Sequence, residues 1–444
     1  MRHLIQTLVR LHPLQRVAVF IWFALLIGVT GRVLFAPLRS HTVVPIYLTA
    51  AERWQRSEPL YVELPRLDVY RNPPGIAAAF IPLTWLPERL AGLLWRALGV
   101  TLFLVGLGRM VRDGLPRPLT PGESGAVFSL AVIPAIPSIS NGQTNMIIIG
   151  ALLLGATAAA RLPGPSQTRA VPPPTRGRWT FAIIGSWLTI ATAVKVYPAA
   201  VGLLIGLVNR YRVYPWFFAG CAVCFAFPYL LQTPGYVSDE YENFAVHVVA
   251  DDRTWAALTR APQDLFLAFR VWAAPPMVEI YLLAKLAAAA GMAGLVGLAL
   301  RQTRNPREVV PLGFHLGCIW VTVLGPATEI PTYVLLGPTA ASVAVLGAAD
   351  RRTLGGRIRF GLAGLGYGLM ILPIVRDMLP NGKPFHALAL PPIGGALVLM
   401  SVIWSGARMI WAGTGSHTLH TASADRDETS TEERRPPCPT DRAA

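Results

Sequence analysis

Apolar stretches close to membrane-spanning length recur along almost the whole chain. A helix needs about 20 apolar residues to cross the hydrocarbon core of a bilayer. We place such stretches at 17–36, 90–110, 124–138, 143–160, 179–195, 197–208, 213–231, 279–300, 310–325, 329–348, 358–375 and 388–412. Charged residues make up 14% of the sequence, against about 25% in soluble domains. The sequence therefore predicts an all-α polytopic membrane protein with about 11–13 transmembrane helices.

Two apolar segments allow more than one interpretation. Residues 73–87 are short and rich in proline, which favours a re-entrant or broken helix, although a separate crossing is an alternative. Residues 17–36 follow Arg2, Arg10 and Arg16 as the core of a signal peptide would. Because no small-residue cleavage site comes after them, we expect a retained first helix.

The excess of positive charge indicates how the chain is oriented. The formal net charge is +15, and 36 Arg but only three Lys supply the cations. If the N-terminus is cytoplasmic and the spans alternate, sixteen arginines lie in internal loops: Arg109, Arg112, Arg117, Arg161, Arg169, Arg176, Arg178, Arg210, Arg212, Arg301, Arg304, Arg307, Arg351, Arg352, Arg357 and Arg359. This distribution follows the positive-inside rule. It predicts a multi-pass protein of the cell (inner or plasma) membrane with both termini cytoplasmic, and no nucleic-acid partner.

The same alternation leaves two long outer loops, 38–72 and 232–278. We expect one membrane domain over 1–412, followed by a polar cytoplasmic tail at 413–444 that is disordered. Both loops carry patterns of interfacial helices. In the first loop, one helical face would hold Ile46, Tyr47, Ala50, Ala51 and Trp54.

The first outer loop ends in a candidate reactive pair. Asp68 and Arg71 are three residues apart, just before a double proline that returns the chain to the membrane. A carboxylate there can act as a base, and a guanidinium can hold a phosphate. The alternative is an ordinary surface ion pair.

Polar residues also mark the outer ends of several spans. Asn141, Gln143 and Asn145 are candidates for binding sugar or acceptor hydroxyls, although such amides can simply cap helices. Lys195 and Tyr197 are candidates for binding the donor phosphate, and a snorkelling lysine is the alternative for Lys195.

Glu329 is a further ionisable group at an outer span end, either catalytic or paired with Lys195 or Arg71. His247 lies among acids in the second loop, but no metal-ligand spacing repeats, so we predict no metal site. No phosphate-binding glycine loop, dinucleotide motif or nucleophile elbow occurs.

Several motifs together resemble a known family. In chain order they are PIYLTAAERW with EPLY, YRNPPGIAAAFIPLTWLP, NGQTNMIIIGALLL, TAVKVYPAAVGLL and GPATEIPTYVLLGP. From about Arg39 to Pro338 the chain is similar to glycosyltransferase family 87, the polyprenyl-phosphate-mannose-dependent α-mannosyltransferase-like membrane proteins. The resemblance implies a GT-C fold, an active site on the outer side, a lipid-phosphate sugar donor and a carboxylate base in the first loop. It implies no cofactor besides that co-substrate.

One position departs from the family pattern. The family usually has an Asp a few residues before the Tyr that corresponds to Tyr47, whereas this chain has no acid between His41 and Ile46. Asp68 is our first candidate for the base, and His41 and Glu329 follow it.

These observations predict an inverting membrane glycosyltransferase. It would move a hexose, with mannose expected, from a polyprenyl-phosphate donor to a glycolipid, glycan or similar acceptor on the outer face. Two other functions remain open: a transporter or flippase of lipid-linked sugars, and a non-catalytic relative.

Overall fold

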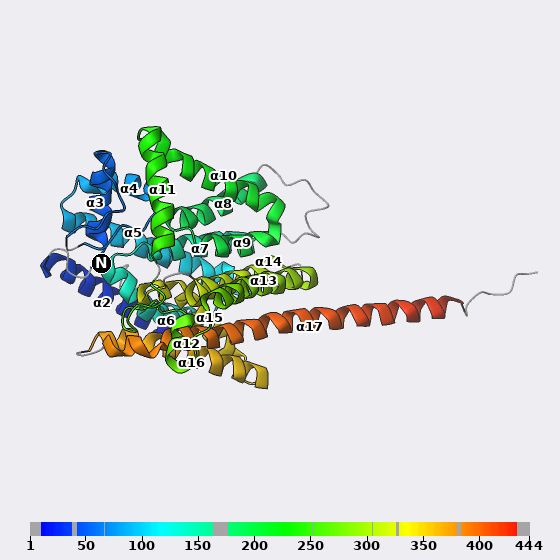
Figure 1. Cartoon of the computed structure of the whole chain (residues 1–444). Coiled ribbons are helices and arrows are strands. Elements are labelled where there is room, and N and C mark those ends of the chain that lie inside the picture. The colour runs from blue at the N-terminus through cyan, green and yellow to red at the C-terminus, as the bar shows by residue number, and fades with distance from the viewer. Residues whose placement is uncertain are drawn as a thin grey trace, which may run out of the picture.

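A computed structural model describes residues 10–37, 42–65, 67–162, 176–251, 253–303, 305–325, 328–379 and 383–432. Most of these residues are helical (Figure 1). In this part of the chain the only extended pairing is an isolated bridge between Leu64 and Leu67. The prediction of an all-α protein is confirmed.

The chain order of the helices is as follows. The α-helices are α2 (Pro13–Phe35), α3 (Val44–Gln55), α4 (Pro74–Thr84), α5 (Glu88–Arg109), α6 (Pro121–Asn141), α7 (Asn145–Ala160), α8 (Arg176–Val194), α9 (Ala199–Gly206), α10 (Arg210–Ala226), α11 (Pro234–Ala250), α12 (Leu265–Trp272), α13 (Val278–Thr303), α14 (Pro306–Ile319), α15 (Gly337–Ala349), α16 (Leu354–Asp377) and α17 (Leu390–Glu432). Short 3-10 or π segments are η1 (Met110–Gly114), η2 (Leu207–Asn209), η3 (Phe227–Leu230), η4 (Trp320–Leu324), η5 (Ile330–Leu335) and η6 (Lys383–Leu388).

The apolar helices confirm a multi-pass membrane protein. Eight described helical runs are long and apolar enough to cross a bilayer, with Ala199–Leu230 counted as one run. Shorter apolar helices lie at Pro74–Thr84, Asn145–Ala160, Trp179–Val194 and Gly337–Ala349. Neighbouring helices such as α5 and α7, α7 and α8, and α16 and α17 pack along each other across the view of Figure 1.

The apolar run Ala199–Leu230 is a hairpin, as expected from the separate predicted spans at 197–208 and 213–231. The Tyr214 hydroxyl donates to the Leu203 carbonyl oxygen at 2.7 Å. Eleven residues along one straight helix would separate these positions by about 16 Å, so the chain reverses at η2. Its two arms have different neighbours: α9 packs on α14, whereas α10 packs on α8.

Helix α4 settles how the proline-rich segment 73–87 is built. It contains 11 residues, so it is about 16 Å long and cannot cross a core of about 30 Å. The segment therefore forms a short helix before α5, consistent with the broken or re-entrant interpretation.

The predicted first-loop helix is α3, and the structure shows what covers its apolar face. Tyr47, Ala51 and Trp54 of α3 are buried, and the Tyr47 ring lies 4.9 Å from that of Phe80 on α4. Helix α4 packs on α3, so this apolar face contacts protein. The second loop, for which the sequence predicted interfacial helices, contains α11 and α12.

Helix α17 continues beyond the predicted end of the membrane domain. Its helical path reaches Glu432, past residue 412, and projects beyond the other helices in Figure 1. Residues 433–444 lie outside the described residues, so the disordered tail stays a prediction.

Close packing around α7 positions the candidate site. Nearly every residue of α7 is buried, and a Cβ on Gly106 of α5 would lie 2.8 Å from the Gly150 carbonyl oxygen. Small residues allow such close helix contacts in membranes. The first residue of α7, Asn145, is thereby held in a fully buried position.

Candidate active site

One cavity collects most of the residues that the sequence marked. Its volume is about 1260 Å³. Walls come from the loop before α4, the α6–α7 turn, the α8–α9 junction, the segment 244–285 and the region 320–332. The predicted residues that line it are Asp68, Arg71, Asn141, Gln143, Lys195, Tyr197 and Glu329. His41 lies outside the described residues.

The segment that carries Asp68 and Arg71 is fixed from both sides. The Asn72 side-chain amide donates to the Val194 carbonyl oxygen at 2.9 Å, and the Tyr61 hydroxyl donates to the Asn72 carbonyl oxygen at 2.7 Å. These contacts tie the first loop to the end of α8. The two candidate residues are thus held at the cavity wall.

Asp68 and Arg71 form an ion pair, at 2.6 Å between Oδ2 and Nη1, as the alternative interpretation of their spacing expected. The other Asp68 oxygen accepts from the Val69 backbone N–H at 2.9 Å, and 59% of the Asp68 side chain is exposed. Arg71 also reaches Asp251, at 3.1 Å from Nε to Oδ2. Burial works against the charged Arg71 guanidinium, but its carboxylate partners outweigh that effect and raise its pKa.

A second arginine extends this pairing to Glu329. Arg253 Nε lies 3.3 Å from Asp251 Oδ1, and its Nη1 lies 3.0 Å from Glu329 Oε1. The Gln143 amide donates to the other Glu329 oxygen at 3.3 Å. Carboxylates and arginines therefore alternate from Asp68 to Glu329.

Asp251 and Arg253 were not among the predicted site residues. Their only sequence signal was the charged run at 251–253 in the second long loop. Several other acids of that loop gave the same signal, and only the folded chain brings this pair between Arg71 and Glu329.

The amide turn between α6 and α7 meets the same network. Asn145 donates to Gln143 Oε1 at 2.7 Å, and its own Oδ1 faces the Tyr197 hydroxyl at 3.2 Å and Lys195 Nζ at 3.4 Å. Asn145 is fully buried and orients these groups from behind the cavity wall. Asn141 lines the cavity at the end of α6.

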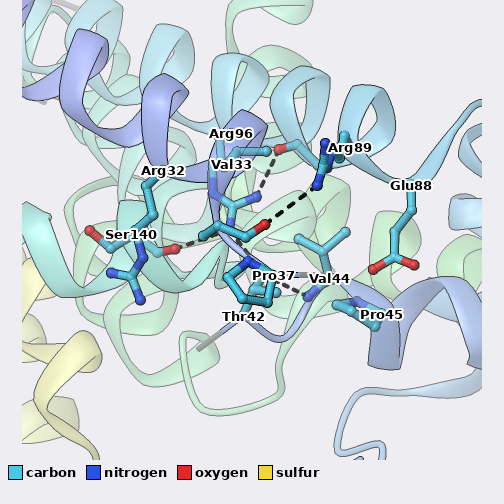
Figure 2. A pocket seen from close by; sticks show the side chains of 12 residues that line it. Arg32, Val33, Pro37, Thr42, Val44, Pro45, Glu88, Arg89, Arg96 and Ser140 are labelled. Atoms are coloured by element: carbon cyan, nitrogen blue, oxygen red, sulfur yellow. Dashed lines mark hydrogen bonds between the residues drawn. The ribbon is translucent and has the colours of Figure 1, made fainter. Parts of the chain in front are cut away.

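Arg96 of α5 fixes this turn from the opposite side. Its guanidinium donates to the carbonyl oxygens of Ile139 at 2.9 Å and Ser140 at 3.0 Å, and to Thr42 Oγ1 at 2.9 Å. Figure 2 shows Arg96 between Thr42 and Ser140, beside a pocket of about 50 Å³. That pocket is too small for a sugar, so we assign Arg96 a positioning role.

Gly142 allows the turn to close. It has a φ of +69°, which favours glycine, and it ends α6 in the left-handed conformation common after helices. A Cβ at this position would lie 2.7 Å from Val44 Cγ2. The glycine therefore permits α3 to approach the turn.

Lys195 has a different environment from the arginines. Within the described part of the chain, no carboxylate oxygen lies within 4 Å of its Nζ; its contacts are Asn145 and the Tyr197 ring, at 5.7 Å. Burial lowers the Lys195 pKa, although Glu329 partly opposes this shift. A cation without a paired carboxylate is available to an incoming anion.

The charges of the network define what it can bind. Asp68, Asp251 and Glu329 balance Arg71 and Arg253 to within one negative charge, and Lys195 offsets that charge from a short distance. In the described residues, no three His, Cys, Asp or Glu side chains come together as a metal site. The arrangement can hold a phosphate beside carboxylates and amides.

Comparison with known proteins gives the following relationships. No curated protein matches the sequence. The crystal structure of ArnT from Cupriavidus metallidurans bound to undecaprenyl phosphate is 14% identical, with 88% of this chain and 77% of ArnT covered at a TM-score of 0.33. The apo structure of the same ArnT is 15% identical, with coverages of 88% and 78% at a TM-score of 0.36. These scores are low.

A sequence profile of glycosyltransferase family 87 matches residues 70–325, more than half of the chain. The matched range contains Arg71 and Lys195, begins just after Asp68 and ends just before Glu329. With its apolar helices, this multi-pass membrane protein belongs to glycosyltransferase family 87.

Proposed function

We propose that this protein transfers a hexose, with mannose as the expected sugar, from a polyprenyl-phosphate donor to a glycolipid or glycan acceptor. The observation that carries this proposal is one cavity lined by Lys195, Asp68 and Glu329, in which Lys195 has no paired carboxylate among the described residues. Phosphate binding and proton removal are the two tasks that such a transfer requires.

The donor phosphate is assigned to Lys195, Arg71 and Tyr197. During transfer the bond between C1 of the sugar and the phosphate oxygen breaks, and negative charge grows on the departing polyprenyl phosphate. Lys195 and Arg71 stabilise this charge, because opposite charges attract strongly where water is scarce. The Tyr197 hydroxyl can donate to a phosphate oxygen once it leaves Asn145.

The base is assigned to Asp68. It takes the proton of an acceptor hydroxyl, whose oxygen then bonds to C1 on the face opposite the phosphate, so the configuration inverts. Asp68 is more exposed than Asp251, and both Asp251 oxygens face arginines. Glu329 and His41 are the alternative bases.

The amides beside the carboxylates are assigned to sugar hydroxyls. Gln143 and Asn141 line the cavity, and Asn145 holds Gln143 in place. No cofactor besides the lipid-phosphate sugar is required in this scheme. The arginine distribution supports cytoplasmic termini and a cavity on the outer side of the membrane.

A lipid chain can reach this cavity from the bilayer. Its lining includes Val248 and Val249 of α11 and Leu282 of α13, all well exposed. Helix α11 packs on α4 and η3, whereas α13 packs on α14 and α17. Apolar walls on two separately supported helices suit a polyprenyl chain.

The test uses purified protein in proteoliposomes with polyprenyl-phosphate mannose labelled in the sugar. Membrane glycolipid extract is supplied as acceptor, and products are separated by chromatography. We expect label to move to the acceptor, and Lys195→Met to slow this movement strongly. Movement of intact labelled lipid between leaflets without transfer would instead show a flippase. If neither transfer nor lipid movement is observed, the protein is a non-catalytic relative.

A further inference from the structure

A small pocket beside the α6–α7 turn is lined by three arginines. They are Arg32 of α2 and Arg89 and Arg96 of α5, and the view of Figure 2 shows Arg32 and Arg89 on either side of Arg96. Glu88 is the one acid in the described lining, so three positive charges and one negative charge leave +2. None of these four side chains lines the reaction cavity. The pocket is therefore a separate site with an excess of positive charge.

Arg96 is a buried cation without a negative partner. It is 8% exposed. Its guanidinium donates to Thr42 and to the turn, and also to the Gly92 carbonyl oxygen at 3.0 Å, and all these acceptors are uncharged. No carboxylate oxygen of the described chain lies within 4 Å of it. A buried charge without an opposite charge is unfavourable, so an anion in the pocket would stabilise Arg96.

Arg32 and Arg89 are also available to an anion. Both are exposed, and neither lies within 4 Å of a carboxylate oxygen in the part of the chain that the structure describes, Glu88 included. The Arg89 guanidinium makes one long hydrogen bond, at 3.5 Å from Nη2 to the Ala36 carbonyl oxygen. The positive charge of Arg32 acts on Arg96. These two cations repel each other, and a bound anion would offset the repulsion.

The pocket lies where two candidate membrane spans end on the same side of the bilayer. Arg32 is in the last turn of α2, and Arg89 is the second residue of α5. The helices between them, α3 and α4, have 12 and 11 residues and are too short to cross a bilayer. Trp85, one turn before Arg89, is 76% exposed, and tryptophan is enriched at membrane–water interfaces. The pocket is therefore at the depth of the lipid headgroups.

The volume of the pocket and its arginines suit a phosphate group. A cavity needs about 10–15 Å³ on this measure to hold one water, so a pocket of about 50 Å³ has room for several waters or for one phosphate. Guanidinium groups bind phosphate through two parallel hydrogen bonds. At headgroup depth, the phosphate of an anionic lipid reaches the pocket while its acyl chains stay in the bilayer. A membrane lipid is thus the source of phosphate that fits the location.

The α6–α7 turn connects this pocket to the reaction cavity. Arg96 donates to two carbonyl oxygens at the end of α6, and Thr42 Oγ1, which accepts from Arg96, donates to the Asn141 carbonyl oxygen at 3.2 Å. Asn141 and Gln143 of the same turn line the reaction cavity. An anion that holds Arg96 in place therefore also stabilises the turn.

We infer that Arg32, Arg89 and Arg96 bind the phosphate of an anionic membrane lipid, and that this lipid stabilises the α6–α7 turn. The inference goes beyond the proposed function, because the lipid is neither the sugar donor nor the acceptor. No bond of the lipid is made or broken at this site.

Binding can be measured by native mass spectrometry of the detergent-purified full chain. The probes are phosphatidylglycerol, diacylglycerol, which lacks the phosphate, and inorganic phosphate as a competitor. We expect wild type to bind phosphatidylglycerol, to bind diacylglycerol weakly and to be little affected by inorganic phosphate. Arg32→Gln should bind phosphatidylglycerol about fivefold more weakly, and the double variant Arg32→Gln/Arg89→Gln more weakly still. Arg96 is left unchanged, because its loss would also remove the hydrogen bonds of the turn.

Two variants control for general charge loss and for lipid bound in the reaction cavity. Arg56→Gln removes an exposed arginine at the end of α3, about 18 Å along that helix from Val44 of the pocket, and should leave phosphatidylglycerol affinity unchanged. Lys195→Met alters the reaction cavity and should keep the loss of affinity that Arg32→Gln causes. Thermal unfolding midpoints without lipid should match wild type in Arg32→Gln and Arg56→Gln.

Hydrogen exchange measures the effect on the turn. The Gly142 and Gln143 backbone N–H groups donate to the carbonyl oxygens of Ile139 and Ser138, so their exchange reports opening of the turn. Phosphatidylglycerol should slow this exchange in wild type and not in Arg32→Gln/Arg89→Gln. Equal slowing in both proteins would show that the lipid acts elsewhere and would overturn the inference.

The binding outcomes also separate this inference from the proposed function. The inference is wrong if Arg32→Gln binds phosphatidylglycerol as tightly as wild type, or if Arg56→Gln weakens binding equally. Equal competition by inorganic phosphate would identify free phosphate as the ligand and overturn the assignment to a lipid. None of these measurements requires sugar transfer. If proteoliposomes show no transfer while Arg32-dependent lipid binding persists, the proposed function fails and the lipid site stands.

Discussion

Replacing Lys195 by methionine separates a functional cation from a structural one. Methionine keeps an unbranched apolar stem of similar length and removes only the ammonium. Because no described carboxylate lies within 4 Å of Lys195 Nζ, the substitution leaves no carboxylate without its partner. We therefore expect unchanged or slightly higher stability, since burying the ammonium is unfavourable.

The effect on transfer should be large. A hydrogen bond between the ammonium and a phosphate oxygen contributes about 2–3 kcal/mol, which corresponds to a loss of about 30- to 150-fold in kcat/KM for the donor. The assay is sugar transfer in proteoliposomes over a range of donor concentrations. Thermal unfolding of the same preparations gives the stability.

The pH profile provides a second readout. Burial lowers the Lys195 pKa, so the ammonium loses its proton as the pH rises through a value below that of ordinary lysine. Wild-type kcat/KM should fall over that range. Lys195→Arg, which stays charged, should retain activity to higher pH.

Two results would refute this reasoning. A decrease in the free energy of unfolding as large as the ~2–3 kcal/mol expected for transfer would show that Lys195 stabilises the fold. Transfer within threefold of wild type in Lys195→Met would show that the donor phosphate binds elsewhere.

Four further substitutions test the network and the turn. Asp68→Asn should lower kcat by 100-fold or more, about the smallest contribution of a general base, whereas Glu329→Gln should cost about tenfold; the reverse order in initial-rate assays would make Glu329 the base. Arg253→Gln breaks both of its ion pairs and should reduce transfer about tenfold, with at most about 1 kcal/mol of stability lost because the pairs are partly exposed; an unchanged rate would mean that the bridge has no role in the reaction. Gly142→Ala meets Val44 and requires an unfavourable φ, so it should destabilise by about 1–2 kcal/mol; an unfolding midpoint equal to that of wild type would contradict this.

The local pattern predicted the elements well. Period and length of the apolar stretches predicted the helices. The proline-rich stretch at 73–87 favoured a re-entrant or broken helix over a separate crossing, and it contains the short helix α4. The amphipathic spacing of α3 was also visible. These features depend on neighbouring residues in the chain and on the thickness of a bilayer.

The partners of each face were not predictable in the same way. The apolar face of α3 suits lipid and protein equally, because both bury the same side chains. Its burial against Phe80 depends on α4 folding back, which no pattern within α3 records. The pattern of an apolar face predicts that the face is shielded from water, but it does not predict which element covers it.

The sequence by itself determined a helical membrane protein, its family motifs and a set of polar residues at span ends. Only the tertiary structure decided that Asp68, Lys195 and Glu329 line one cavity, and that Arg253 joins Asp251 to Glu329. The physical reason is the separation along the chain of the residues that interact. Helix formation and membrane insertion depend on local composition, whereas ion pairs across 76 residues depend on how the helices pack.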